Sequence, residues 1–256
     1  MFEKTKRLKV EDLQNMATSC KHEFNVTDVE RVIKEEKEEE EEDPDLLLLP
    51  KHPSRIIITG RSGSGKTVLT LNLLFKWLKY DCLYIVCSTV RLQPKYEMIC
   101  DLALLYPAKF RIFESMKTFN LKMVNKNKKN LVLFDDLQEL DNKELNNVND
   151  FFVRGRHSNC TVLFLAQTFY RVPIRCRGSA NVFIFFKVNS VRDKARIHKE
   201  VCGDLDKDTF LKIFDAATEE SNGQNEYGYF VVDTDEKDLS TRYRMNFKQL
   251  FLDNLD

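Results

Sequence analysis

The chain has 256 residues, 43% of them hydrophobic, so it is long enough for one sizeable α/β domain with its own core. Its 40 basic and 40 acidic residues give a formal net charge of zero. No apolar run approaches the roughly 18 residues of a membrane span, and the N-terminus lacks the apolar core of a signal peptide, so we expect neither feature.

Charge is unevenly distributed along the chain. Residues 34–45 hold two lysines against seven glutamates and two aspartates, a net charge of −7. In the residues before them, the positive and negative charges are equal in number. The rest of the chain therefore carries +7. An acidic linker followed by a basic domain suggests a polyanionic partner. The same charge would also serve solubility alone, and the composition does not choose between these interpretations.

The seven cysteines are odd in number and form no CxxC pair. Several lie in or beside apolar runs, where a free cysteine behaves as a small hydrophobic residue. This usage predicts reduced thiols in a cytosolic type of compartment and no zinc site.

Residues 1–49 are predicted to be an N-terminal tail with a flexible acidic linker, and residues 50–256 to form the main domain. Short helices are expected over 10–17 and 27–37, and Pro44 ends the acidic run because proline disfavours helix in the residue before it. The acidic run is typical of a solvated segment, although it could also mimic DNA charge or dock a partner. The apolar residues 46–49 are expected to pack on the edge of the domain.

From residue 50 onward, strands and helices alternate, which predicts an α/β fold with a mainly parallel sheet covered by helices on both faces. We predict strands over residues 55–59, 83–88, 111–113, 131–134, 161–166 and 181–186, with a final strand pair over 227–232 and 241–246. We predict helices over residues 66–79, 93–105, 142–153, 191–201 and 206–217.

The sequence IIITGRSGSGKT at residues 56–67 has the spacing G-x-x-x-x-G-K-[ST] between a buried strand and a helix, as a phosphate-binding loop requires. Its glycines let backbone N–H groups approach phosphate, and the helix start adds a favourable dipole. Lys66 would reach the β- and γ-phosphates, and the Thr67 hydroxyl would bind Mg²⁺. The predicted cofactors are therefore ATP and Mg²⁺. The predicted nucleotide-binding residues are Gly60, Arg61, Ser62, Gly63, Ser64, Gly65, Lys66 and Thr67.

The sequence LVLFDD at residues 131–136 places two carboxylates directly after an apolar strand. Ligands of parallel sheets gather at the carboxyl ends of strands, so this pair should face the phosphate loop. We expect Asp135 to hold Mg²⁺ through water. Asp136 is expected to polarise the water that attacks the γ-phosphate.

The next strand, TVLFLAQT, ends in Gln167, a neutral amide. Such an amide can orient water or sense the γ-phosphate, although a polar residue can also simply mark the end of a strand. Arginines lie on both sides of this strand in the sequence. One of them could stabilise transition-state charge, in its own subunit or in a neighbour, and others could contact nucleic-acid phosphates. These arginines are Arg154, Arg156, Arg171, Arg175 and Arg177.

The combination GRSGSGKT, LVLFDD, GRHSNCTVLFLAQTFYRVPIRCR, NVFIFFK and YGYFVVD, in this order, resembles the FtsK/HerA-type DNA-packaging ATPases. It is most similar to the poxvirus-type branch shared by large DNA viruses, virophages and Polinton/Maverick elements. The similarity covers residues 54–246. It implies a P-loop NTPase with a RecA-like core, a homo-oligomeric ring that is usually six-membered, and ATP-driven movement of double-stranded DNA into a preformed capsid. Capsid proteins are then possible partners, and the host cytoplasm or viral assembly site, or the virion, the place of action.

The resemblance also assigns roles by position. Lys66 and Thr67 match the family's phosphate and magnesium residues, and Asp135 matches the acid on the metal side. Asp136 matches the catalytic acid and Gln167 the sensor amide. Many relatives in the wider superfamily have Glu where Asp136 stands, and the shorter side chain implies action through a second water or slower hydrolysis.

The resemblance implies one further role, for an arginine. Arg156, in the sequence GRH, matches the arginine proposed to act on the ATP of a neighbouring subunit, with Arg154 as the alternative.

Three classes of function fit a phosphate loop: a nucleotide kinase or GTPase, an ATP-binding scaffold, and a DNA-translocating ATPase. A GTPase is disfavoured because no N-K-x-D sequence is present. A nucleotide kinase would need an arginine-rich lid, which the cluster at 171–177 could supply, and an ATP-binding scaffold that does not hydrolyse is disfavoured by the intact carboxylate pair. A DNA-translocating ATPase accounts for the basic domain, both nucleotide motifs, Gln167 and the arginines.

Overall fold

The computed structural model describes residues 48–93, 96–137, 140–219 and 228–249. The helices expected over 10–17 and 27–37 and the acidic run lie outside these residues. The described strands are β1 (Arg55–Thr59), β2 (Cys82–Cys87), β3 (Phe110–Phe113), β4 (Asn130–Asp135), β5 (Cys160–Ala166), β6 (Val182–Phe186), β7 (Tyr229–Asp233), β8 (Tyr243–Met245) and β9 (Lys248–Gln249).

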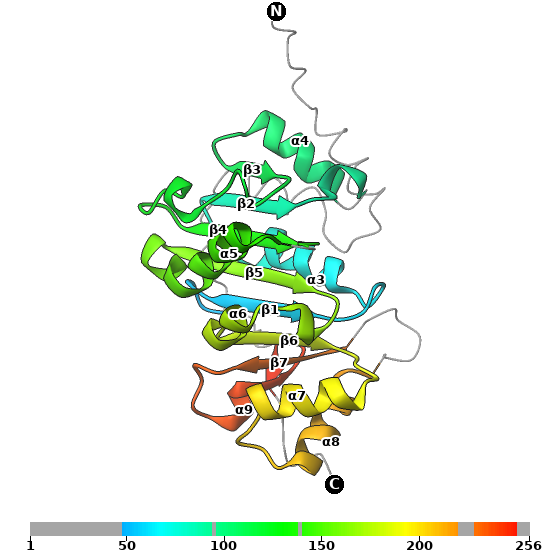
Figure 1. The fold of residues 1–256 in the computed structure, drawn as a ribbon. Coiled ribbons are helices and arrows are strands. Elements are labelled where there is room, and N and C mark those ends of the chain that lie inside the picture. Colours follow the sequence, from blue (N-terminus) through cyan, green and yellow to red (C-terminus); the bar gives the residue numbers. More distant parts are fainter. Residues whose placement is uncertain (1–47, 94–95, 138–139, 220–227, 250–256) are drawn as a thin grey trace, which may run out of the picture.

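These strands form one sheet in the order β3-β2-β4-β5-β1-β6-β7-β8-β9 (Figure 1). The first six in this order are parallel, whereas β7, β8 and β9 pair antiparallel. The carboxyl ends of the parallel strands therefore meet at one edge of the sheet. That edge is where the predicted nucleotide residues should gather.

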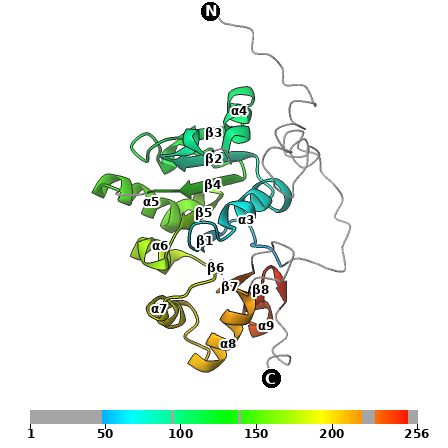
Figure 2. The same cartoon turned by 90° about the vertical axis from the view of Figure 1, so that its right-hand side faces the viewer.

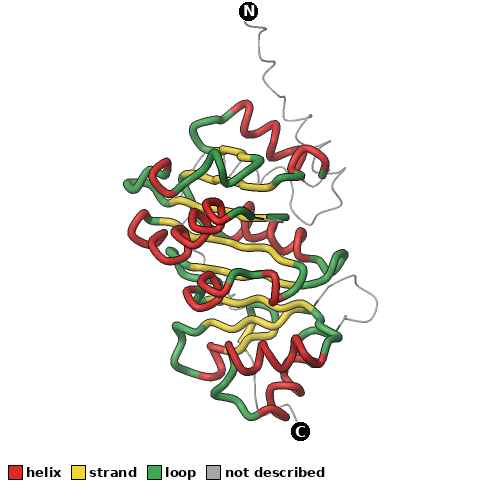
Figure 3. The backbone as a smooth tube through the Cα atoms, in the orientation of Figure 1, coloured by secondary structure: helices red, strands yellow, loops and turns green. Residues whose placement is uncertain are grey.

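Helices cover both faces of the sheet (Figures 2 and 3). One face packs against α3 (Lys66–Asn72), which continues as a wider π-helical turn to Trp77, and against α4 (Glu97–Leu105). The other face packs against four of the remaining helices, whereas the short α9 (Leu239–Arg242) leads into β8. Those four helices are α5 (Asn142–Arg154), α6 (Ile174–Ser179), α7 (Val191–Val201) and α8 (Lys207–Ala217).

Side chains alternate between the two faces, as the period of a strand requires. In β1, Ile56 and Ile58 belong to the core under α3 and α4, whereas Ile57 belongs to the core under α5 to α8. All three are 0% exposed. Burial on both faces explains why these strands read as continuous apolar runs in the sequence. The predicted α/β architecture is confirmed.

Most predicted elements are present within one or two residues. The predictions for β1 and α7 match residue for residue. The helix predicted from residue 93 begins at Glu97, and the one predicted to residue 79 ends at Trp77. Two short helices, α6 and α9, have no counterpart in the prediction, because four to six residues are too few to show a helical period.

A buried ion pair joins β7 and β8, near the edge of the sheet that β9 forms. Arg244 Nη2 lies 3.0 Å from Asp233 Oδ2, and both side chains are almost fully buried. Arg244 Nη1 also donates to the carbonyl oxygen of Leu48 at 2.6 Å, and Leu49 packs on the adjoining core. The described part of the apolar patch thus lies on the domain edge, as expected.

Among the helices that the structure describes, none combines the length and apolarity of a membrane span.

Candidate active site

The phosphate loop uses glycine for two different physical reasons. Gly63 and Gly65 have φ values of 75° and 90°, in the left-handed region that glycine adopts without strain. Gly60 is restricted by space instead, because a Cβ there would lie 2.6 Å from Ser64 Oγ and 2.7 Å from Phe186 Cβ. The loop therefore turns sharply against β6 and leads into α3 at Lys66.

A cavity of about 550 Å³ lies at the carboxyl edge of the sheet. Four residues of the phosphate loop and the start of α3 line it, namely Ser62, Gly63, Lys66 and Thr67. The other four predicted loop residues shape the loop from outside the cavity lining. Lys66 Nζ donates to the carbonyl oxygens of Gly60 and Arg61, the latter at 2.8 Å. Its ammonium group is thus held at the mouth of the loop.

Asp135, the last residue of β4, lines the same cavity and is only 8% exposed. The Tyr96 hydroxyl donates to its Oδ2 atom at 2.6 Å. Burial raises the pKa of Tyr96 well above its usual value, and the nearby Asp135 charge adds to the effect. Tyr96 therefore stays a neutral donor at ordinary pH, and it fixes the orientation of the carboxylate.

Asp136 also lines the cavity and is held at two points by the segment that follows β2. Thr89 Oγ1 donates to Asp136 Oδ2 at 2.7 Å, and Ser88 Oγ donates to the Asp136 carbonyl oxygen at 3.1 Å. The Gln93 amide in turn donates to Thr89 Oγ1. The Asp136 backbone has φ 52°, a left-handed conformation that aspartate tolerates better than most residues. Asp136 is therefore held in a single orientation.

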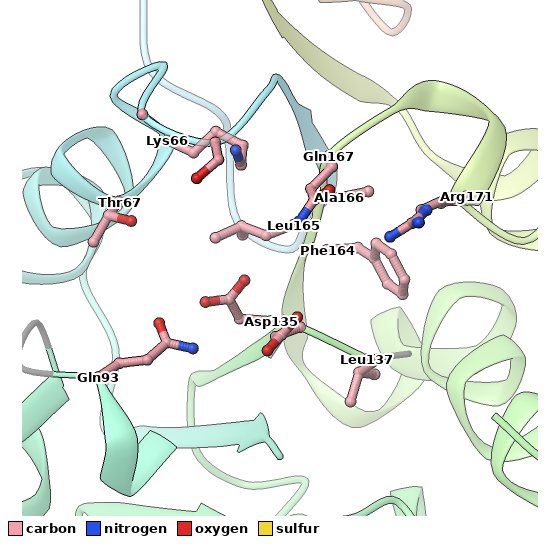
Figure 4. Close-up of a pocket in the computed structure, with 13 residues that line it drawn as sticks. Lys66, Thr67, Gln93, Asp135, Leu137, Phe164, Leu165, Ala166, Gln167 and Arg171 are labelled. Atoms are coloured by element: carbon pink, nitrogen blue, oxygen red, sulfur yellow. The ribbon is translucent and has the colours of Figure 1, made fainter. Parts of the chain in front are cut away.

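Strand order places Gln167 in the middle of the site. Strand β5 pairs with β1 on one side and with β4 on the other, so its end lies between the phosphate loop and the carboxylate pair. Gln167 follows β5 directly and lines the cavity, as does Arg171. Figure 4 shows both side chains facing the space that Thr67 and Asp135 also face. The structure thus brings both nucleotide motifs and the predicted sensor amide together.

The five arginines around β5 do not lie together. Arg175 is exposed on α6, and the other four lie in three different places. Arg171 lines the cavity, whereas Arg154 and Arg156 precede β5 and lie at the opposite, amino edge of the sheet. Arg177 is buried, where it lies 2.8 Å from Glu200 Oε2 and donates to the Val172 carbonyl oxygen at 2.7 Å. Arg177 therefore joins α6 to α7, and its buried side chain is not placed to contact nucleic-acid phosphates, one of the roles considered for these arginines.

Residues 41–234 match the family model described as Poxvirus A32 protein. The chain belongs to this family. The resemblance to the poxvirus-type branch that the motifs predict is thereby confirmed. The chain is 28% identical over 157 residues to the DNA packaging protein OPG160 of variola virus and, equally, to that of vaccinia virus (strain Copenhagen). Each alignment covers 55% of this chain and 56% of the relative, so the chain spans about half the length of the curated relatives it matches.

Among solved structures, this A32-family chain is similar to the genome packaging NTPase B204 from Sulfolobus turreted icosahedral virus 2 in complex with ATP-gammaS. That pair has 13% sequence identity and a TM-score of 0.49, over 72% of this chain and 94% of the other. The pCW3 conjugation coupling protein TcpA, in a monomer form with ATPgS, gives 14% identity and a TM-score of 0.43, over 60% and 55% of the two chains.

The site of this A32-family protein contains three residues that the motifs did not reveal: Thr89, Gln93 and Tyr96. They follow β2, whose last residue, Cys87, is paired with Asp135. The carboxyl ends of all parallel strands meet at one edge, so the polar residue Thr89, directly after the strand predicted over 83–88, was the available signal. Tyr96 had no such signal, because its role depends on how the chain returns toward β4.

The donor atoms of the site suit a small, hard cation. The Thr67 hydroxyl and the Asp135 carboxylate come from different elements and line the same cavity. Oxygen ligands of these two kinds are those that Mg²⁺ takes in nucleotide sites, together with phosphate oxygens and water. The residues present therefore fit a magnesium ion bound with a nucleoside triphosphate.

Proposed function

We propose that this chain is a subunit of an ATP-hydrolysing motor that moves double-stranded DNA into a preformed capsid. The observation that carries the proposal is one cavity lined by a phosphate loop, two carboxylates and an amide, in a member of the poxvirus A32 family. DNA is proposed as the substrate because the curated relatives are named as DNA packaging proteins. We take residues 50–256 as the ATPase domain and residues 1–49 as its tail.

Each of the cavity residues would have a separate role in ATP hydrolysis. Lys66 would exchange its loop carbonyl partners for the β- and γ-phosphate oxygens of ATP. Thr67 and Asp135 would hold Mg²⁺, which when bound neutralises charge on the phosphates. Asp136 would accept a proton from the attacking water, and Gln167, between the two motifs, would orient that water.

A direct test of this proposal is the identity of the products. Purified protein with Mg²⁺ and ATP alone should release ADP and inorganic phosphate, because water is the acceptor. A nucleotide kinase would need a second nucleotide and would leave the phosphoryl group on it. A protein that binds ATP and releases no phosphate would contradict the motor and support a scaffold.

Such a motor would act at the viral assembly site in the host cytoplasm, with capsid proteins as docking partners.

Arg156 is proposed to act on the ATP of a neighbouring subunit. Its position at the amino edge of the sheet is opposite the cavity of its own chain. In a ring built by head-to-tail contacts, unlike surfaces of identical subunits meet, so an amino-edge residue can face a neighbour's site. An arginine delivered in this way can contribute several orders of magnitude to the rate of phosphoryl transfer.

Mixing Arg156→Ala subunits into wild-type protein should therefore reduce ATP hydrolysis by more than their share. One altered subunit disables a site on its neighbour and interrupts the ring. ATPase activity measured against the mixing ratio should fall below the straight line. The matched control is Arg192→Ala, an exposed arginine on α7 outside this set. A strictly proportional loss would exclude the role in trans, and the same titration with Arg154→Ala tests the alternative arginine.

Thr89→Val should lower kcat for ATP roughly tenfold without changing KM. The variant keeps the shape of the side chain and loses the hydroxyl that donates to Asp136 at 2.7 Å. A hydrogen bond to a charged group contributes about 1.5 kcal/mol or more, which corresponds to about a tenfold change in rate. Thr89→Ser keeps the hydroxyl and should restore most of the activity. An unchanged kcat in Thr89→Val would show that Asp136 needs no such support.

A further inference from the structure

Two basic segments meet at the amino edge of the sheet, opposite the nucleotide cavity. The turn NKNKKN at residues 125–130 leads into β4, and the 3₁₀ turn Gly155–Ser158 leads into β5. Strands β4 and β5 are paired from Asn130 and Cys160 onward, so the two turns are neighbours in space. Both lie on the left of Figure 1, where these strands begin.

Hydrogen bonds hold the backbones of the two turns together. The side-chain amide of Asn159 donates to the Lys128 carbonyl oxygen at 2.9 Å, and the side-chain amide of Asn130 donates to the Ser158 carbonyl oxygen at 3.2 Å. The backbone N–H of Lys129 donates to Asp81 Oδ2 at 2.7 Å, which ties the turn to the start of β2. The lysines therefore project from a fixed backbone and not from a loose loop.

The cationic ends of these side chains have no acidic partner in the described part of the chain. Lys126, Lys128 and Lys129 are exposed, as are Arg156 and His157 beside them. No ion pair joins any of the five to a carboxylate among the residues that the structure places. A phosphate that binds here would not have to displace an existing salt bridge.

The two turns together present a region of positive charge. Lys126, Lys128, Lys129 and Arg156 place four exposed cations on adjoining turns, with no ion pair to a carboxylate among the residues that the structure describes. Such a region attracts polyanions.

We propose that the lysine turn, defined as Lys126, Lys128 and Lys129, binds the phosphate backbone of double-stranded DNA. This inference rests on the proposed function and names the surface through which the motor holds its substrate. A duplex presents a phosphate about every 3.4 Å along each strand, which suits several flexible ammonium groups on one rigid turn. Lysine contacts to phosphate carry no sequence information, as the transport of a whole genome requires. A single triphosphate on a neighbour would need one or two cations, the task assigned to Arg156.

The test compares the full-length triple variant Lys126→Gln, Lys128→Gln, Lys129→Gln with wild type in DNA binding without hydrolysis. Fluorescence anisotropy with two unrelated duplexes, over a series of salt concentrations, gives Kd and its salt dependence. The slope of log K against log salt should shrink by about one for each lysine in contact with a phosphate. Kd should rise at least about tenfold, equally for both sequences. The matched control is Lys199→Gln, Lys207→Gln, Lys212→Gln, with the same charge change on exposed positions of α7 and α8.

The outcomes separate this surface from the proposed function. A lower slope in the triple variant, with the control unchanged, supports the surface even if DNA does not stimulate hydrolysis. An unchanged slope in the triple variant overturns the surface while the motor still stands. A change in oligomer size in place of a change in DNA affinity also overturns it, because the turn would then face another copy of the chain.

Discussion

Replacing Lys66 with alanine should abolish ATP hydrolysis, with a loss on the order of 10³-fold or more. Lys66 is the cation at the mouth of the phosphate loop, where its Nζ atom is held by the carbonyl oxygens of Gly60 and Arg61. Without it, charge on the β- and γ-phosphates is not balanced in the bound state or in the transition state. Both ATP affinity and turnover should therefore fall.

Two measurements separate this effect from a loss of fold. Thermal unfolding of Lys66→Ala without nucleotide should match wild type, because Lys66 is not part of the buried core. Adding Mg²⁺ and ATP should raise the Tm of wild type and leave that of the variant nearly unchanged, since a ligand stabilises only the protein that binds it. Lys79→Ala, an exposed lysine shortly after the same helix, is the control and should behave as wild type. Full hydrolysis in Lys66→Ala would contradict the assigned site.

Replacing Asp136 with asparagine should lower kcat by roughly 10²–10⁴-fold, the usual contribution of a general base. The amide keeps the size of the side chain and can still accept from Thr89 Oγ1, so the local structure should survive. It cannot accept the proton of the attacking water. In contrast to Lys66→Ala, this variant should still bind ATP with Mg²⁺ at near wild-type affinity.

The check combines single-turnover hydrolysis with nucleotide binding. Asp136→Asn should hold ATP and release phosphate slowly, so that bound ATP accumulates. A second variant, Asp136→Glu, tests whether the longer acid found in the wider superfamily also supports hydrolysis here. A variant that loses ATP binding as strongly as Lys66→Ala would place Asp136 in binding and not in proton transfer. A normal kcat would exclude it as the base.

The strands and the two nucleotide motifs could be predicted because they obey local rules. A strand buried on both faces is a continuous apolar run, and β1 is bounded by Arg55 and by Gly60, where no Cβ fits. The phosphate loop also depends on local geometry, through the left-handed Gly63 and Gly65. Asp135 and Asp136 could be placed because the carboxyl ends of parallel strands meet at one edge.

The parts that could not be predicted depend on contacts between distant segments. Thr89 reaches Asp136 across 47 positions of sequence, and Tyr96 reaches Asp135 across 39. Arg177 looks like its exposed neighbours in sequence, yet it is buried because the helix it lies on turns it toward Glu200. The strand order that places Gln167 between the motifs is likewise a property of the whole sheet. Local patterns do not carry this information.

The most direct test of the central claim measures ATP hydrolysis with and without double-stranded DNA while oligomer size is determined in the same buffer. The motor predicts a closed ring whose ATPase rate rises when duplex DNA is added, and that stimulation should weaken as salt increases. An ATPase rate that is indifferent to DNA in a protein that stays monomeric would contradict the account.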